Sequence, residues 1–207
     1  LFKTLTSWII SHVFVCLAFA QPINPNFRHI SINDGLSDTH IQCISQDKKG
    51  FMWFGTPYGL NKYDGNGFTQ YLHNPTNKKT IEHNNVTSIF EDSSQRMWIG
   101  TESSLNYFNR TIGVFENVIK KQEGIYRSEM GAVKKIAEDE QGRLWLARTH
   151  GLQVYDPNNK TIRTFLPKDE DNGFLGEIGD LIIDKKGKLW VATMVGIRYF
   201  DRNSFKF

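Results

Sequence analysis

DKKGFMWFGT, residues 47–56, is the clearest of four related stretches in this chain. In each stretch an aspartate stands six residues before a tryptophan, and a glycine or alanine stands two residues after that tryptophan. Internal repetition at an interval of about 45 residues is typical of proteins built from copies of one supersecondary unit. The repeated residues are Asp47, Asp92, Asp139 and Asp184, followed by Trp53, Trp98, Trp145 and Trp190.

Each copy divides into four short segments that we expect to be β-strands. Their apolar residues alternate, and Gly, Asn, Asp and Pro separate them, which is typical of antiparallel meanders. In the first copy the expected strands are Ile41–Gln46, Phe51–Gly55, Leu60–Tyr63 and Phe68–Tyr71. The four copies run near residues 41–71, 86–118, 133–166 and 178–207, and their later fourth strands are expected at 114–118, 162–166 and from 205 onward.

The turn between the first two strands has a clear chemistry. Asp47 suits the first position of a type I turn, because its side chain accepts backbone N–H bonds, and Gly50 suits a position with positive φ. The third and fourth copies repeat this turn at 139–142 and 184–187, whereas Gln95 replaces the glycine in the second copy, where we expect a different turn. A catalytic residue is normally unique, so the four recurrent aspartates are interpreted as structural.

The small residue after each tryptophan predicts how the sheets pack. Glycine or alanine there allows a neighbouring sheet to approach closely, and we expect the tryptophan ring to cover its neighbour's small position. Four-stranded sheets of this kind cannot bury both faces alone, so they stack around an axis. The predicted fold is all-β, a β-propeller with four four-stranded blades, and a linear array is the alternative.

Residues 1–20 have the layout of a cleaved secretory signal peptide. Lys3 precedes an apolar stretch, Trp8–Phe19, and Ala18-Phe19-Ala20 places small residues before Gln21. The apolar stretch is shorter than the ~20 residues that span a bilayer, which disfavours the alternative of an uncleaved anchor. Export is therefore expected.

The mature part, residues 21–207, is expected to be an incomplete set of propeller repeats. Phe27–Ile32 looks like a fourth strand without its three predecessors, yet the fourth copy supplies its own fourth strand. We therefore expect further copies after Phe207, and because propellers have ~4 to 8 blades, a seven-bladed ring. The chain begins at Leu1 rather than methionine, which also indicates a fragment.

Composition and spacing exclude several functions. The net charge is +3, and the 25 basic and 22 acidic residues are interspersed, so a nucleic-acid partner is not predicted. His73 and His83 lack a third ligand at sensible spacing, so neither a metal nor another cofactor is predicted. No catalytic triad can be identified, and Cys43 in its alternating segment is interpreted as a small core residue.

Ligand binding is the favoured function. The loops that join second to third strands, and one blade to the next, gather at one end of a propeller, and such loops carry function on a rigid scaffold. Tyrosine stacks on sugar faces, while arginine, glutamate and asparagine bond hydroxyl groups, so an oligosaccharide or another small molecule is the predicted partner. An ordinary exposed loop is the alternative for each residue. The candidates are Tyr58, Asn85, Glu102, Arg127, Arg148 and His150, with Met194 in a corresponding loop.

The pattern Asp-x-x-Gly-x-x-Trp-x-Gly-Thr, followed by Gly-Leu-Asn-x-Tyr-Asp at 59–64, resembles the two-component regulator propeller repeat. The resemblance covers residues 27–207, and Asn33–Ser37 is similar to that family's opening segment. The chain departs from the pattern at Arg148, where threonine is usual, and at Gln95 and Ser104, where glycine is usual.

This resemblance implies the periplasmic sensor region of a hybrid two-component sensor histidine kinase at the inner membrane. It implies oligosaccharide sensing, a homodimer in the full-length form, and membrane and kinase segments downstream. Ligand binding would change how propellers pack, and the kinase would respond to that change. The chain itself is predicted not to be an enzyme. The alternatives are a secreted propeller enzyme, such as a lyase or glycosidase, and an adhesion or scaffold propeller.

Overall fold

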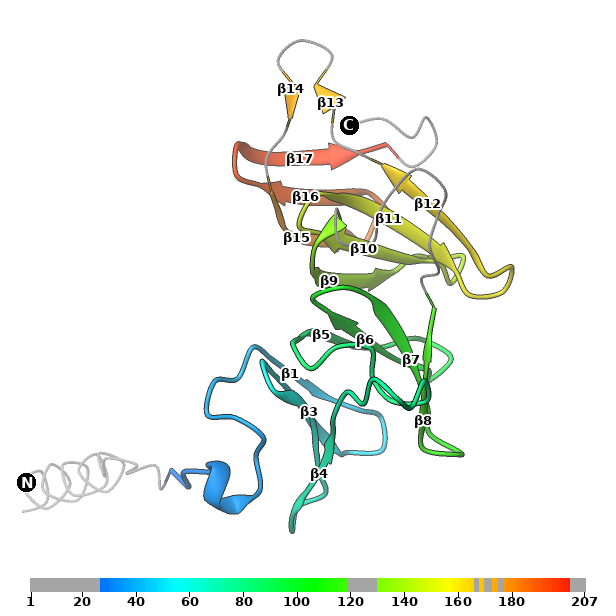
Figure 1. Ribbon diagram of the computed structural model, residues 1–207. Helices are drawn as coiled ribbons and strands as arrows, with labels where there is room; N and C mark the ends of the chain where they lie inside the picture. Colours follow the sequence, from blue (N-terminus) through cyan, green and yellow to red (C-terminus); the bar gives the residue numbers. More distant parts are fainter. Residues whose placement is uncertain (1–26, 119–129, 166–167, 170–172, 175–176, 202–207) are drawn as a thin grey trace, which may run out of the picture. The chain divides into compact units, whose positions relative to one another are not determined.

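The computed structural model describes residues 27–118, 130–165, 168–169, 173–174 and 177–201 (Figure 1). The expected signal peptide at 1–20, Arg127 and the strand expected from 205 lie outside these residues. The chain divides into two units, Leu1–Ile30 and Ser31–Phe207. Four residues of the first unit are described, so the fold below is that of the second. In the part of the chain that is described, no helix is long and apolar enough to cross a bilayer.

The regular secondary structure in the described part of the second unit is almost entirely β-strand, which confirms the predicted all-β class. One short 3-10 helix, η1, occupies Ile32–Asp34. The first eight strands are β1 (Cys43–Gln46), β2 (Met52–Thr56), β3 (Gly59–Tyr63), β4 (Phe68–Tyr71), β5 (Val86–Glu91), β6 (Met97–Thr101), β7 (Leu105–Asn109) and β8 (Val114–Asn117). The later strands are β9 (Val133–Glu138), β10 (Leu144–Arg148), β11 (Gly151–Asp156), β12 (Thr161–Phe165), β13 (Lys168–Asp169), β14 (Gly173–Phe174), β15 (Ile178–Ile183), β16 (Leu189–Thr193) and β17 (Gly196–Phe200).

These strands form the predicted series of antiparallel sheets (Figure 1). Three sheets have four strands in chain order: β1-β2-β3-β4, β5-β6-β7-β8 and β9-β10-β11-β12. A fourth sheet contains β15-β16-β17, and β13 pairs with β14 in a small hairpin that the sequence did not predict. Each described strand of the first copy begins and ends close to its expected bounds. The number of blades in a closed ring stays a prediction.

The expected strand at Phe27–Ile32 is wrong. Residues 27–31 adopt no regular secondary structure, and Ile32 begins η1. The reason is local: the Asp34 carboxylate accepts the Ser31 N–H at 2.9 Å, and the Ser31 hydroxyl oxygen accepts the Asn33 N–H at 3.2 Å. Such side-chain bonds compete with a strand ladder.

The Asp–Trp pattern has a physical basis that the sequence did not reveal. One oxygen of Asp47 accepts the N–H groups of Lys49 at 3.0 Å and Phe51 at 2.9 Å, which holds the predicted turn. The other oxygen accepts the indole N–H of Trp53 at 2.9 Å. A spacing of six residues therefore joins the turn to the core. The same indole bond recurs at Asp92–Trp98, Asp139–Trp145 and Asp184–Trp190.

The turn at Gln95 does not differ from the others, contrary to the expectation. Gln95 has φ +63°, close to Gly142 at +75° and Gly187 at +77°. Its N–H bonds the Asp92 carbonyl at 2.9 Å, as the Gly50 N–H bonds the Asp47 carbonyl. The hydrogen bonds of the turn therefore outweigh the left-handed strain, which is roughly 1–2 kcal/mol for a residue with a Cβ.

Replacing this strained residue by glycine is expected to stabilise the protein. Gln95→Gly relieves the left-handed strain and raises the free energy of unfolding by about 1 kcal/mol, after the extra backbone entropy of glycine is subtracted. Urea denaturation followed by tryptophan fluorescence measures the change. Gln141→Gly is the matched control, because Gln141 precedes a glycine in the equivalent turn and has no positive φ. It should not stabilise, and an equal gain from both variants would contradict the strain argument.

The core lies between successive sheets. β5 packs on β1 and β2, β9 packs on β5 and β6, and β15 packs on β9 and β10. Each buried tryptophan joins a cluster with the middle strands of the following sheet, which confirms stacking of the sheets. Trp53 lies with Met97, Ile99 and Phe108; Trp98 lies with Leu144, Leu146 and Tyr155; and Trp145 lies with Leu189, Val191 and Phe200.

The glycines after the tryptophans allow the predicted close approach of the neighbouring sheet. The residues that lie against them belong to the first strand of that sheet and are not tryptophans. A Cβ at Gly55 would lie 2.6 Å from Cγ1 of Val86, the first residue of β5. A Cβ at Gly100 would lie 2.8 Å from the carbonyl oxygen of Val133, the first residue of β9. The expectation that a tryptophan ring covers this position is therefore wrong: the first strand of the next sheet covers it.

Equivalent apolar residues differ in exposure between the outer and the inner described sheets. Ile44 in β1 is 60% exposed, whereas its counterpart Ile136 is 3% exposed; Ile197 in β17 is 76% exposed, whereas its counterpart Leu105 is fully buried. The outer faces of the first and fourth described sheets thus carry apolar residues that inner sheets bury.

Cys43 packs between the first and second sheets, and burial raises the pKa of its thiol to about 12, so the thiol stays protonated.

Candidate functional site

Two buried asparagines hold the loops that precede the first two sheets. Oδ1 of Asn61, in β3, accepts the N–H of Ser37 at 2.9 Å. Oδ1 of Asn106, in β7, accepts the N–H of Glu82 at 3.1 Å. Both side chains are fully buried. Since buried amides of this kind restrict the backbone that they bond, the loops leading to β1 and β5 have defined positions.

These loops bring three polar side chains together. Nε2 of Gln42 donates to Oδ1 of Asn85 at 2.7 Å, and Nδ2 of Asn85 donates to Oε2 of Glu102 at 3.0 Å. The backbone N–H of Glu102 also donates to the Asn85 carbonyl at 3.0 Å. Gln42 precedes β1, Asn85 precedes β5 and Glu102 follows β6. We name Gln42, Asn85 and Glu102 the loop-edge cluster; it links the first two sheets.

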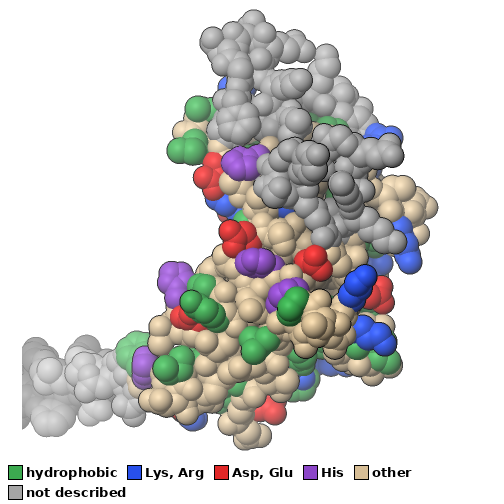
Figure 2. Space-filling model, viewed as in Figure 1, with side chains coloured by type: hydrophobic (Ala, Val, Ile, Leu, Met, Phe, Trp, Pro, Cys, Tyr) green, Lys and Arg blue, Asp and Glu red, His purple; other side chains and the backbone are tan. Residues whose placement is uncertain are grey.

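His83 lies beside the loop-edge cluster. Its Nδ1 accepts the N–H of Asn85 at 3.1 Å and lies 3.9 Å from Oε2 of Glu102. In this contact Nδ1 is the hydrogen-bond acceptor. His83 and Glu102 are about half exposed, and Figure 2 shows histidine and acidic side chains gathered on one face of the molecule. The arrangement therefore offers several hydrogen-bonding groups to solvent.

The other predicted residues that the structure describes contact residues outside this cluster. Tyr58, in the loop from β2 to β3, is 65% exposed, and its N–H donates to the Thr56 hydroxyl at 3.0 Å. His150 is exposed, and its N–H donates to the Met130 carbonyl at 3.1 Å. Met194 is exposed in the loop from β16 to β17. Arg127 lies outside the described residues.

Arg148 is buried and supports the structure. It is 1% exposed, its Nε donates to the Gly131 carbonyl at 3.1 Å, and its Nη1 donates to Oε1 of Gln153 at 3.1 Å. Nη2 donates to the carbonyl of Ser103, in the second sheet, at 3.2 Å. The guanidinium thus links two sheets and points into the protein, whereas the equivalent Thr56 caps its own hairpin by donating to Gly59 O at 3.0 Å.

Restoring the usual threonine at this position is expected to destabilise the protein. Arg148→Thr leaves the carbonyls of Gly131 and Ser103 and the Gln153 amide without their donor, which costs about 3 kcal/mol of unfolding free energy. Thermal and urea denaturation measure the loss. Lys135→Thr, at a site 53% exposed, is the control and should change stability by less than about 0.5 kcal/mol. A neutral or stabilising Arg148→Thr would show that the inter-sheet bonds contribute nothing.

Sequence reasoning missed two members of this region. Gln42 reaches Asn85 across 43 positions of sequence, and no local pattern marks such a pair. His83 was considered only with His73, but Nδ1 of His73 bonds the Ile81 carbonyl at 2.8 Å. Within the described ranges no three His, Cys, Asp or Glu side chains are grouped to hold a metal ion.

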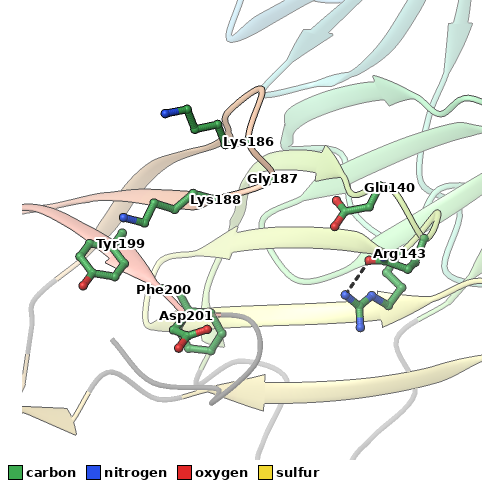
Figure 3. Close-up of a pocket in the computed structure, with 9 residues that line it drawn as sticks. Glu140, Arg143, Lys186, Gly187, Lys188, Tyr199, Phe200 and Asp201 are labelled. Carbon is green, nitrogen blue, oxygen red and sulfur yellow. Dashed lines mark hydrogen bonds between the residues drawn. The ribbon is translucent and has the colours of Figure 1, made fainter.

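A polar cavity of about 680 Å³ lies between the turns of the third and fourth sheets (Figure 3). Its charged lining includes Arg143, Lys186 and Lys188. Arg143 pairs with Asp139 at 2.8 Å, and Nζ of Lys188 lies 3.8 Å from the centre of the Tyr199 ring. Figure 3 shows both lysine side chains pointing away from Arg143, so the three cations do not converge on one point. This cavity is therefore a weaker candidate than the loop-edge cluster.

Comparison with known proteins identifies the repeat. The family model described as "Two component regulator propeller" matches residues 35–58 and 80–103. Each matched segment contains the first two strands of a sheet with their Asp–Trp pair, and the second segment also contains Asn85 and Glu102. These two segments are therefore similar to repeats of this family.

Three proteins show how far the likeness extends. Histidine kinase P4 of Formosa agariphila is 44% identical over 62 residues, which are 30% of this chain and 4% of that protein. The extracellular domain of a hybrid two-component system from B. thetaiotaomicron is 25% identical, with a TM-score of 0.64 over 80% of this chain and 22% of that one. Virginiamycin B lyase from Staphylococcus aureus is 14% identical, with a TM-score of 0.57 over 81% of this chain and 57% of that one, and this shows the fold alone. The chain thus spans only a small part of the two signalling proteins.

Proposed function

Because two segments of the chain match the two-component regulator propeller model, we propose that it is a ligand-sensing propeller module of a two-component signal transduction receptor. The module works in the periplasm, exported by the signal sequence at residues 1–20, and its ligand is an oligosaccharide. Membrane and kinase segments of the same receptor, in homodimeric form, are its partners. The kinase identity of one relative and the extracellular two-component domain of another support this assignment.

The observation that carries the proposal is the loop-edge cluster. Its amides and carboxylate present donors and acceptors side by side, as vicinal sugar hydroxyls require. Two of its three members, Gln42 and Glu102, are exposed. Outside the cluster, the exposed Tyr58 ring offers an apolar face on which a pyranose could stack. A small ligand with many hydroxyl groups fits this chemistry better than an apolar one.

The position of the cluster also suits signalling. Gln42 and Asn85 come from loops that precede two different sheets, and their bond joins those loops at 2.7 Å. A ligand that bonds both residues favours whichever packing arrangement of the two sheets gives it the best contacts. The kinase segments would respond to that population shift.

Calorimetry of the full protein against a panel of oligosaccharides tests the proposal. We expect one member to bind, and both Asn85→Ala and Glu102→Gln to weaken that binding about tenfold, the loss of one good polar contact. Glu140→Gln, an exposed glutamate in the β9–β10 turn, is the matched control and should bind as the parent does. No heat across the panel would overturn sugar sensing, and unaltered binding by both variants would overturn the site.

A secreted enzyme is the second candidate, because His83 and Glu102 lie 3.9 Å apart in the same exposed region. A histidine and a carboxylate at this separation can share acid and base roles. Incubating the protein with the same panel and separating the products by chromatography distinguishes the two functions. Cleavage that His83→Ala abolishes would favour the enzyme, whereas binding without turnover favours the sensor.

A further inference from the structure

In two of the sheets, an aromatic residue at the end of the fourth strand stacks on the tryptophan of the same sheet. The Tyr71 ring lies 5.9 Å from the Trp53 ring at an interplanar angle of 21°. The Phe165 ring lies 6.2 Å from the Trp145 ring at 18°. Tyr71 is paired with Leu60 and Phe165 with Leu152. The stacking ring is therefore a regular part of the repeat.

The second sheet lacks this ring. Val118 occupies the equivalent position, since its N–H donates to the carbonyl of Leu105, the counterpart of Leu60, at 3.0 Å. Val118 packs at the edge of the cluster that contains Trp98. A valine side chain is much smaller than a phenyl ring, so space is left beside the tryptophan.

A cavity of about 580 Å³ lies at this place, between the second and third sheets. Its volume falls within the roughly 300–1,000 Å³ range of small-molecule sites. The rings of Tyr107 and Tyr155 lie 5.4 Å and 5.7 Å from the Trp98 ring. The lining is thus aromatic on one side. Its remaining members are apolar, polar or charged: Val118, Ile162, Pro157, Asn117, Arg96, Glu116 and Lys160.

A second departure from the repeat occurs at the same cavity. Lys160 has φ +54° in the turn from β11 to β12, and the corresponding residue of the turn from β7 to β8 is Gly113, with φ +67°. A left-handed lysine is strained where glycine is not. Lys160 thus brings a long cationic side chain to the cavity lining. Strain of this kind is found at functional sites.

Lys160 is the cation available to a ligand there. The other cation, Arg96, already pairs with Asp92 through Nε and Oδ2 at 2.6 Å. Lys160 forms no ion pair with any residue in the part of the chain that the structure describes. The two departures from the repeat therefore place an empty ring position and an uncommitted positive charge around one cavity.

We propose that this cavity binds a small molecule with a planar aromatic ring and an anionic group. The ring takes the place of the missing aromatic side chain against Trp98 and the two tyrosines, and Lys160 pairs with the anion. This site is separate from the loop-edge cluster, because Arg96 precedes β6 whereas Glu102 follows it. It does not depend on the proposed sensing of oligosaccharides.

Titration of the full protein with benzoate and with indole-3-acetate, followed by calorimetry, tests this inference. At least one of them binds, while neutral benzyl alcohol and non-aromatic cyclohexanecarboxylate bind about tenfold more weakly or not at all. Val118→Phe restores the ring of the repeat and weakens binding about tenfold or more without lowering the melting temperature. Lys160→Gly weakens binding by a similar factor, while the melting temperature rises because strain is removed.

Matched variants separate these effects from general damage. Val118→Ala keeps the ring position open and Lys160→Arg keeps the charge, so both bind the acid as the parent protein does. Glu102→Gln should also leave this binding unchanged, which distinguishes the site from the loop-edge cluster. Absence of binding by both acids would overturn the inference, as would unaltered binding by Val118→Phe and Lys160→Gly together.

Discussion

Asp92→Ala lowers the free energy of unfolding by about 3–5 kcal/mol, the range measured when one partner of a buried charged pair is removed. The Asp92 side chain is 1% exposed. It accepts the N–H of Arg96 at 2.8 Å, the indole N–H of Trp98 at 2.8 Å and Nε of Arg96 at 2.6 Å. The substitution leaves a buried indole donor without an acceptor and the Arg96 guanidinium without its counter-ion. Urea denaturation followed by circular dichroism measures the loss.

The fourth copy of the repeat supplies the control. Asp184 accepts the backbone N–H groups of Lys186 and Lys188 and the indole N–H of Trp190, each at 2.9 Å. The indole bond, first among several, holds the pKa of Asp184 below its usual range. Asp184 is less buried than Asp92, so water replaces the lost acceptor and Asp184→Ala should cost much less. Equal losses for the two variants would show that burial does not determine the contribution of this bond.

Trp145→Ala is expected to lower the free energy of unfolding by about 3–5 kcal/mol, as is usual when a buried tryptophan is removed from a core. The Trp145 side chain is fully buried between the third and fourth sheets, where its ring lies 6.2 Å from Phe165 and 5.6 Å from Phe200. Its removal opens a cavity between two sheets and leaves Asp139 without the indole donor. Thermal unfolding followed by circular dichroism measures this loss.

Trp190→Ala tests whether packing or the local turn is responsible. Trp190 bonds Asp184 just as Trp145 bonds Asp139, but its side chain is only partly buried. The substitution therefore removes the same hydrogen bond with much less packing, and its cost should be clearly smaller. If both substitutions lower the free energy of unfolding equally, the hydrogen bond rather than contact between sheets would be the main contribution of the tryptophan to stability.

The candidate site shows where prediction from the sequence stops. Asn85 and Glu102 were predicted because loops at one end of a propeller are recognisable from the repeat, and the structure joins them at 3.0 Å. Gln42 could not be predicted, since its contact with Asn85 depends on how two sheets are placed. Arg148 was predicted from its loop position, but the fold buries its side chain against carbonyls of two sheets.

The order of the strands, the Asp–Gly turns and the stacking of successive sheets follow from the sequence, because local hydrogen bonds and alternating apolar residues act over a few positions. The conformation and contacts of the residues that depart from the repeat follow only from the tertiary structure. Gln95 keeps its turn under strain, and Phe27–Ile32 forms no strand. Val118 and Lys160 are far apart in sequence, and only the packing of the second sheet on the third brings them to one cavity.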